Sequence, residues 1–146
     1  MPLVHHQTAI AASVDAIWDH LWRKVERPED YVPAAVGSKI LARPGEHTVE
    51  RLMVLRDETG AERPTQEIIT ADRATLTVIF KAKDNPVFDG LVVNTIMDEG
   101  EHPLFAITMS WTEKPGVPSQ DAVDWQAMVT DAVEQTKRQV EAEVAG

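Results

Sequence analysis

Cysteine is absent from the sequence, and basic residues are few. Without cysteine the chain forms no disulfide and offers neither a thiolate nucleophile nor a cysteine zinc site. Lysine and arginine together number 14, against 24 aspartates and glutamates, so the net charge is −10. Nucleic-acid phosphates and anionic membrane surfaces are bound by basic patches. The charge balance therefore argues against a nucleic-acid partner and against a membrane partner.

Long hydrophobic runs are also missing. No apolar stretch approaches the ~20 residues that a membrane-spanning helix needs, and the N-terminal MPLVHHQTAI lacks the basic-then-apolar form of a signal peptide. We therefore expect a cytoplasmic location. A chain of 146 residues fits one domain, residues 1–146, which is long enough to bury roughly two thirds of its unfolded surface.

Motifs for common cofactors and for nucleophilic catalysis are missing too. The sequence has no phosphate loop, no nucleophile elbow and no dinucleotide fingerprint. Its histidines do not fall at the spacing of metal ligands, and His20 is assigned to the polar side of a helix. The sequence therefore predicts no cofactor and no metal.

What is present is an ordered series of strand and helix patterns. A first strand is followed by Ser13, a candidate N-cap, and then by Ile17, Trp18, Leu21 and Trp22 at helical spacing. Prolines close this helix and bracket a second, short helical turn. The expected strands are 3–11, 38–43, 47–56, 63–71, 75–83, 90–98 and 104–113, separated by turn formers. Apolar residues at helical steps then predict one long C-terminal helix that begins at Asp121 and ends at Ala145.

Three segments carry a family resemblance: SVDAIWDHL, KAKDNPVFDGLVVNTI and LFAITMSWTEKPG. With them the chain resembles the START-like (SRPBCC) helix-grip superfamily, which includes birch-pollen-allergen-like proteins and polyketide cyclases, and within it the AtaL-like family. The resemblance implies an α+β fold in which a curved antiparallel sheet of about seven strands wraps on the long C-terminal helix, with two short helices after strand one. It also implies an apolar cavity between sheet and helix. It implies no particular chemistry, because the superfamily holds carriers, sensors and enzymes.

Alternation along the strands predicts which side chains face that helix. Assuming two-residue turns at Thr59-Gly60 and Asp72-Arg73, Glu67 lies opposite Leu52 on one side and Val78 on the other. The predicted inner face is therefore apolar apart from a few polar residues, and Arg51 and Met53 belong to the outer face. The inner members are Glu50, Leu52, Val54, Thr65, Glu67, Ile69, Leu76, Val78 and Phe80.

The reversal at residues 84–90, DNPVFDG, leaves two interpretations open. A simple four-residue loop places Phe80 opposite Leu91 and leaves the large apolar side chains of the last two strands in solvent, where a homodimer built on Phe105, Met109 and Trp111 would cover them. One extra residue, in a bulge at Gly90, swaps the faces and brings that set inward. Burial is worth ~1.5–3 kcal/mol for each such side chain, so the face swap is favoured.

Two polar residues are the candidates for chemistry. Glu67, between apolar neighbours, is a candidate general acid or base, since burial raises the pKa of a carboxyl group. Its structural alternative is an ion pair with an arginine at a cavity wall. Asn94, if inward, offers hydrogen bonds to a ligand carbonyl or hydroxyl. Its alternative is a core amide that bonds to the backbone.

The leading hypothesis is a protein that binds a small apolar or aromatic molecule between the sheet and the C-terminal helix. One alternative is a polyketide-cyclase-like enzyme in which Glu67 acts on an enolisable carbonyl held by Asn94. A second alternative is a dimeric interaction module without a ligand. The residues expected to contact the ligand are Leu52, Glu67, Val78, Phe80, Asn94, Ile96, Phe105, Ile107, Met109, Trp111, Trp125 and Val129.

Overall fold

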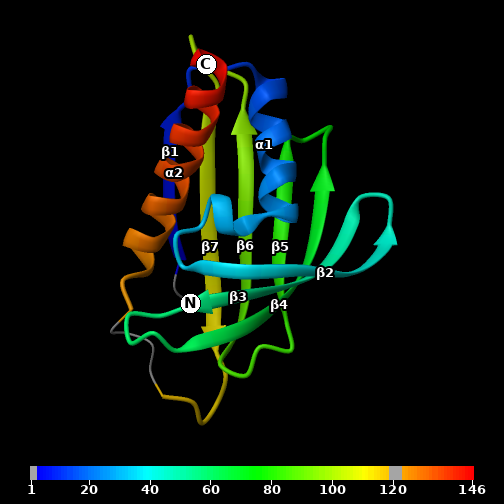
Figure 1. The fold of residues 1–146 in the computed structure, drawn as a ribbon, viewed down its shortest axis with the longest axis vertical. Coiled ribbons are helices and arrows are strands. Elements are labelled where there is room, and N and C mark those ends of the chain that lie inside the picture. The colour runs from blue at the N-terminus through cyan, green and yellow to red at the C-terminus, as the bar shows by residue number, and fades with distance from the viewer. Residues whose placement is uncertain (1–2, 119–122) are drawn as a thin grey trace.

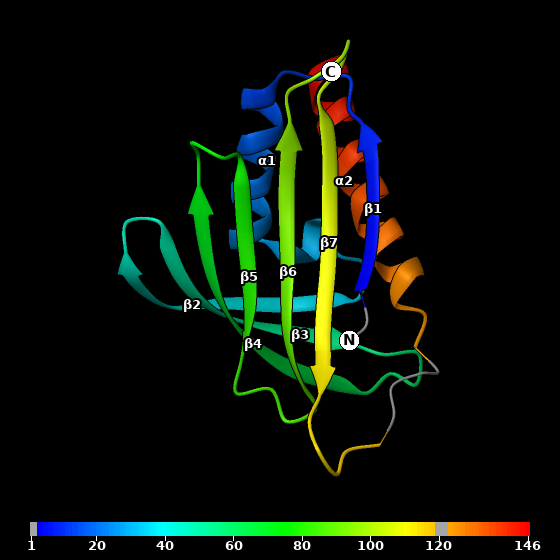
Figure 2. The same ribbon diagram turned by 180° about the vertical axis from the view of Figure 1, so that it is seen from behind.

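The computed structural model describes residues 3–118 and 123–146. One antiparallel sheet carries two helices on the same side (Figure 1), and Figure 2 shows the sheet from behind. The elements in chain order are β1 (Leu3–Ala9), α1 (Val14–Glu26), the 3-10 helix η1 (Pro28–Asp30), β2 (Ala35–Gly45), β3 (Thr48–Arg56), β4 (Glu62–Asp72), β5 (Thr77–Lys83), β6 (Phe88–Met97), β7 (Leu104–Glu113) and α2 (Trp125–Ala145).

The seven strands follow the order β1-β7-β6-β5-β4-β3-β2. β1 therefore closes one edge beside the last strand, and β2 forms the other edge. The sheet curves so that β2 and β3 run across the end of α1, whereas β5, β6 and β7 lie behind the two helices (Figure 1). This is the α+β helix-grip architecture that the sequence predicts.

Both helices begin at side-chain caps. Ser13 Oγ accepts a hydrogen bond from Ala16 N at 3.1 Å, and Asp124 Oδ1 accepts one from Ala127 N at 2.9 Å. Each cap satisfies one of the backbone donors that a helix N-terminus leaves without a partner. The predicted start of the last helix, Asp121, lies outside the described residues. Neither helix in the described part of the chain is long and apolar enough to cross a membrane.

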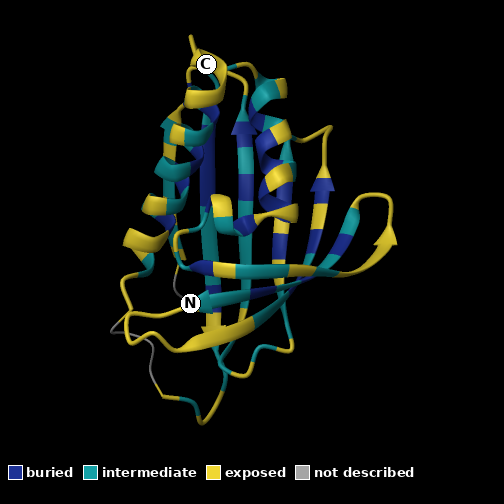
Figure 3. Cartoon of the chain, in the orientation of Figure 1, coloured by how far each residue is buried: buried dark blue, intermediate teal, exposed yellow. Residues whose placement is uncertain are grey.

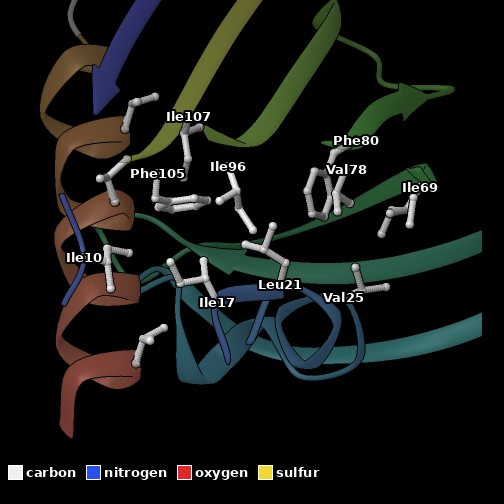
Figure 4. Packing of buried hydrophobic residues seen from close by; sticks show 14 of the residues in the cluster. Ile10, Ile17, Leu21, Val25, Ile69, Val78, Phe80, Ile96, Phe105 and Ile107 are labelled. Atoms are coloured by element: carbon white, nitrogen blue, oxygen red, sulfur yellow. The ribbon is translucent and has the colours of Figure 1, made fainter. Parts of the chain in front are cut away.

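The core lies between the concave face of the sheet and the two helices. Buried positions follow the inward side of β5, β6 and β7 and the facing sides of α1 and α2 (Figure 3). In Figure 4 the side chains of Ile17 and Leu21 from α1 point toward Ile96 and Phe105 of the sheet. From α2 the buried side chains are Val129, Val133, Thr136 and Val140.

The predicted faces of β3 are wrong, and the cause is the turn that follows this strand. Arg56 is the last residue of β3 to pair, with Glu62, so the loop spans residues 57–61 rather than two residues. The Asp57 carboxylate accepts hydrogen bonds from Thr59 N and Ala61 N and holds this longer loop. A shift of one residue exchanges the two faces of a strand.

As a result, β3 turns a different set of side chains inward. Val49, Arg51 and Met53 are buried, and Arg51 pairs with Glu67. Leu52 pairs with Gln66 on the outer face, so its assignment as a ligand contact is wrong. Glu50 and Val54 likewise lie on the outer side.

On β4 and β5 the predicted faces are right, although the pairing is displaced. Glu67 lies opposite Ala82 instead of Val78, and Ile69 lies opposite Phe80. The displacement is an even number of residues, so Glu67, Val78 and Phe80 still face inward, and all three are buried. The chain reverses through residues 73–76, where Leu76 has a positive φ of 55°.

The face swap between β5 and β6 is confirmed. Phe80 pairs with Val92, and Val78 pairs with Asn94, which is the register of the longer reversal. Gly90 is not the site of a bulge: β6 pairs with β7 without interruption from Phe88 to Met97. The left-handed residue is instead Asp84, with φ 53°, and Asn85 Oδ1 accepts hydrogen bonds from Val87 N and Phe88 N.

Gly90 has a different role, which concerns Phe88. A Cβ atom at Gly90 would lie 3.1 Å from two ring carbons of Phe88 and 3.5 Å from Trp111 Cβ. The Phe88 ring therefore occupies the space that a side chain at residue 90 would need. The ring in turn meets Trp125 edge-on, with ring centroids 6.1 Å apart.

We predict that Gly90→Val lowers the free energy of unfolding by about 1–3 kcal/mol, because it overpacks the position that the Phe88 ring occupies. Urea denaturation measures the change. The control is Gly37→Val: a Cβ atom there meets no heavy atom within 4 Å, so its stability should stay close to that of the unmodified chain. Equal effects of the two substitutions would contradict this packing role.

Candidate functional site

Four polar side chains converge in the apolar interior beneath α1. Lys24 comes from α1, Arg51 from β3, Glu67 from β4 and Asn94 from β6, and each is at most 8% exposed. We call these four residues the buried polar cluster. Charged groups are rarely buried unless they are paired or serve a function, so the contacts of each member decide what the cluster does.

Arg51 ties the end of α1 to the sheet. Its Nη1 atom donates to the carbonyl oxygens of Lys24 and Val25 at 3.0 and 2.9 Å, and its Nη2 atom donates to Glu67 Oε1 at 2.6 Å. The last carbonyls of a helix lack partners within the helix and carry partial negative charge, which favours a cation there. The predicted structural alternative for Glu67, an ion pair with an arginine, is therefore confirmed.

Lys24 is the second cation of the cluster. Its Nζ atom donates to Asn94 Oδ1 at 2.9 Å and lies 5.9 Å from the centroid of the Phe105 ring. Burial, and to a smaller extent the positive charge of Arg51, lower the pKa of the Lys24 amine to about 7, while Glu67 acts in the opposite direction. The amine therefore changes its charge near neutral pH.

Two atoms of the cluster lack a hydrogen-bond partner. Among the buried side-chain atoms of residues 3–118 and 123–146, these are Arg51 Nε and Asn94 Nδ2. Both atoms carry N–H donors. A buried donor without an acceptor costs about 1–3 kcal/mol, so the cluster has a free capacity for acceptor atoms. Asn94 thus bonds to a side chain rather than to the backbone, unlike the core amide of the alternative prediction.

An aromatic group lies on the same concave face, toward the start of β6. Phe88 and Trp111 come from adjacent strands and Trp125 from the first turn of α2; the centroids of the two indole rings are 5.1 Å apart. Val92 and Met109 pair with each other on the inner face, yet both are only partly buried. Solvent therefore reaches part of the concave face.

The structure brings together most of the residues expected to contact a ligand. Their shared property is an inward side chain on β4–β7 or on α2. Met109 and Trp125 are partly buried, and the buried members are Glu67, Val78, Phe80, Asn94, Ile96, Phe105, Ile107, Trp111 and Val129. Leu52 is the exception, because it lies on the outer face of the sheet.

Lys24, Arg51 and His20 are the polar interior residues that the sequence interpretation missed. His20 and Lys24 lie three residues from Ile17 and from Leu21, on the buried face of α1, and this spacing is the signal that identifies them. His20 is 3% exposed and hydrogen-bonds to Tyr31 Oη at 2.6 Å, so its assignment to the polar side of the helix is wrong. Arg51 was misplaced by the length of the β3–β4 loop.

A surface depression of about 530 Å³ lies elsewhere, at the turn between β6 and β7. It is lined by Ala9, Glu99, Gly100, Glu101, His102 and Leu104. None of the expected ligand contacts belongs to this lining. Within the described ranges, no three or more His, Asp or Glu side chains come together as a metal ligand set.

The curved sheet around a C-terminal helix is the helix-grip fold, and solved structures of polyketide aromatase/cyclases and of a plant major latex-like protein share it. The aromatase/cyclase Zhui from Streptomyces sp. R1128 superposes with TM-score 0.79 and 15% identity, over 98% of this chain and 95% of that chain. The di-domain aromatase/cyclase StfQ of the steffimycin biosynthetic pathway gives TM-score 0.82 and 14% identity, over 99% of this chain and 52% of that one. The major latex-like protein 151 of Panax ginseng gives TM-score 0.73 and 17% identity, over 97% and 96%.

The chain belongs to the AtaL family, described as acetylaranotin biosynthesis cluster protein L, whose model matches residues 7–145. No curated protein sequence matches the chain. These three solved structures are 14–17% identical to the chain, so they show the fold and leave the role of this chain to its own residues.

We predict that Arg51→Met destabilises the fold by about 3–5 kcal/mol, because it leaves Glu67 and two helix carbonyls buried without a partner. Urea denaturation gives the free energy of unfolding. The matched control is Arg56→Met on the same strand, whose ion pair with Glu62 is about half exposed on both sides; such a surface pair contributes less than about 1 kcal/mol. Similar losses in both variants would contradict the role assigned to Arg51.

A second prediction concerns Lys24 and pH. Its amine has a pKa of about 7 in the folded chain against an ordinary value of 10.5. Between these values the unfolded chain binds more protons, so the free energy of unfolding rises with pH, by at most about 1.4 kcal/mol per pH unit. We expect the stability difference between the unmodified chain and Lys24→Met to shift by about 2 kcal/mol in favour of the former from pH 7 to pH 9. A pH-independent difference in urea denaturation would show that Lys24 keeps an ordinary pKa.

Proposed function

We propose that the protein binds a small apolar or aromatic molecule on the concave face of the sheet, beneath α2. The observation that carries this proposal is the partly open inner surface at Val92 and Met109, which lies near buried donors that lack acceptors. Ligand pockets combine mostly apolar walls with a few polar groups that orient the ligand. The inner face has this composition.

The side chains of α2 support the proposal. Its buried residues are three valines and one threonine, Val129, Val133, Val140 and Thr136. These β-branched side chains are short, so they cover the sheet without reaching far into the space above it. Aromatic side chains at Trp111 and Trp125 would contact one end of the ligand, and the buried polar cluster would contact the other.

A second candidate is an enzyme that acts on an enolisable carbonyl compound, which the structural likeness to two aromatase/cyclases favours. In that function Asn94 would hold the carbonyl oxygen, and Glu67 would transfer a proton. The ion pair with Arg51 engages Glu67 Oε1. While this contact lasts only Oε2 could take the proton, and Glu67 already has the structural role of pairing with Arg51; for that reason the binding function stands first.

The third hypothesis, a dimeric interaction module, required Phe105, Met109 and Trp111 to be exposed on the outer face of the sheet. Phe105 and Trp111 are buried on the inner face and Met109 is partly buried there. They are not available to a second copy of the chain while α2 covers that face. A homodimer through another surface is independent of the proposed binding site.

The test is native mass spectrometry of protein purified from its own host, followed by extraction of whatever copurifies. We expect a stoichiometric added mass, which Met109→Trp abolishes by filling the partly open part of the inner face. The control is Ile79→Trp, at an exposed position on β5, which should retain the mass. Circular dichroism verifies that both variants are folded.

Each result has a consequence. A free chain in every preparation, together with no thermal shift by the extracted small molecules of the host, would contradict the binding function. An added mass that survives Met109→Trp would place the ligand elsewhere. Conversion of the extracted compound by the unmodified chain, lost in Glu67→Gln, would decide for the enzyme.

A further inference from the structure

The charges of the buried polar cluster do not balance. Lys24 and Arg51 are basic, whereas Glu67 is the single acid among the four residues. Glu67 Oε1 is already bonded to Arg51. Protonated Lys24 therefore places a charge in the interior next to a neutral amide and an aromatic ring, without a carboxylate of its own. Uncompensated buried charge is unfavourable.

The polar atoms of the cluster that have hydrogen bonds left to make are all donors. Arg51 Nε and Asn94 Nδ2 are donors without acceptors, and Lys24 Nζ has further donor capacity beyond its bond to Asn94 Oδ1. These groups come from three different elements, α1, β3 and β6. A ligand that supplied only apolar surface would leave all of these donors without an acceptor. A ligand that supplied an oxygen acceptor would satisfy them once the surrounding side chains move apart to admit it, because less than 1 Å² of Arg51 Nε and of Asn94 Nδ2 is accessible.

We propose that the ligand carries an anionic oxygen, as a carboxylate or an enolate, which lies against Lys24, Arg51 and Asn94 in the interior. This inference rests on the proposed binding function and names the chemical class of its ligand. The oxygen atom would balance the excess positive charge and accept from the unpaired donors. The apolar remainder of the ligand would extend toward Val92, Met109 and the aromatic group.

A dependence on pH follows from Lys24. The charged groups that face its amine are Arg51 on β3 and Glu67 on β4; Asn94 on β6 and Phe105 on β7 are uncharged. Without ligand the amine is half protonated near pH 7. An anion next to it raises the pKa of the amine. Binding above pH 7 therefore takes up a proton, and the affinity falls as pH rises, toward tenfold per pH unit.

The test compares three naphthalenes that differ in a single substituent. 2-Naphthoate is anionic, 2-acetylnaphthalene is a neutral acceptor and 2-ethylnaphthalene has no acceptor. Titration calorimetry or tryptophan fluorescence gives Kd for each at pH 6 and pH 8.5, in 0.15 M salt, which screens the negative net charge of the surface. We expect 2-naphthoate to bind at least tenfold more tightly than 2-ethylnaphthalene at pH 6 and to lose about thirtyfold in affinity at pH 8.5, with the neutral probes unchanged.

Matched variants assign the effect to the interior. Lys24→Met should remove the preference for 2-naphthoate and its pH dependence, so that 2-naphthoate binds no more tightly than 2-ethylnaphthalene at either pH. Lys81→Met removes the same charge from an exposed position on β5, so it should retain both properties. If Lys24→Met fails to fold, proton uptake by the unmodified chain remains measurable, as a difference in binding enthalpy between phosphate and Tris buffers at pH 8.

The outcomes separate the two proposals. Equal affinities for 2-naphthoate and 2-ethylnaphthalene would overturn the anionic ligand and leave the binding function in place. Tight, pH-independent binding of 2-acetylnaphthalene, equal to that of 2-naphthoate, would overturn the charge requirement. Binding of none of the probes, each tested up to its limit of solubility, would overturn both the anionic ligand and the apolar site.

Discussion

The contact on which the rest of this structure depends is the guanidinium group of Arg51. It bonds to the last carbonyls of α1 and to Glu67 on β4, so it fixes where the end of the helix meets the sheet. Because α1 is held there, Lys24 reaches Asn94 on β6. The interior polar groups are therefore positioned by a contact with a structural function of its own. A buried ion pair stabilises little in net terms, but the loss of one partner is costly.

Two kinds of side chain lie at the two ends of the concave face. At one end, Phe88, Trp111 and Trp125 form an aromatic group between the last two strands and the start of α2. At the other end the buried polar cluster offers donors in surroundings from which water is largely excluded. Hydrogen bonds are stronger in such surroundings than in water, and unpaired groups cost more there. In the proposed function, a ligand that spans the two ends would be bound through its apolar area and oriented through its oxygen atoms.

Several parts of this architecture could be predicted from the sequence, because large apolar side chains must be buried. The swap of faces after β5 could be predicted because Ile96, Phe105, Ile107 and Trp111 are too apolar to remain in solvent together. The faces of β3 could not, because Leu52 and Met53 are both apolar and alternate positions there look alike. In that case the length of the β3–β4 loop decided the register. Asp57, which holds the loop, bonds to backbone atoms that a pattern of residue types does not reveal.

Sequence alone determined the order of strands and helices, the apolar residues on the buried face of α1 and the inward position of Glu67 and Asn94, since periodicity and burial act along one chain segment at a time. Tertiary structure decided which cations meet those two residues. Lys24 and Arg51 lie 27 positions apart and come from different elements. Their approach depends on strand register and on the crossing of α1 over the sheet, which no local pattern encodes.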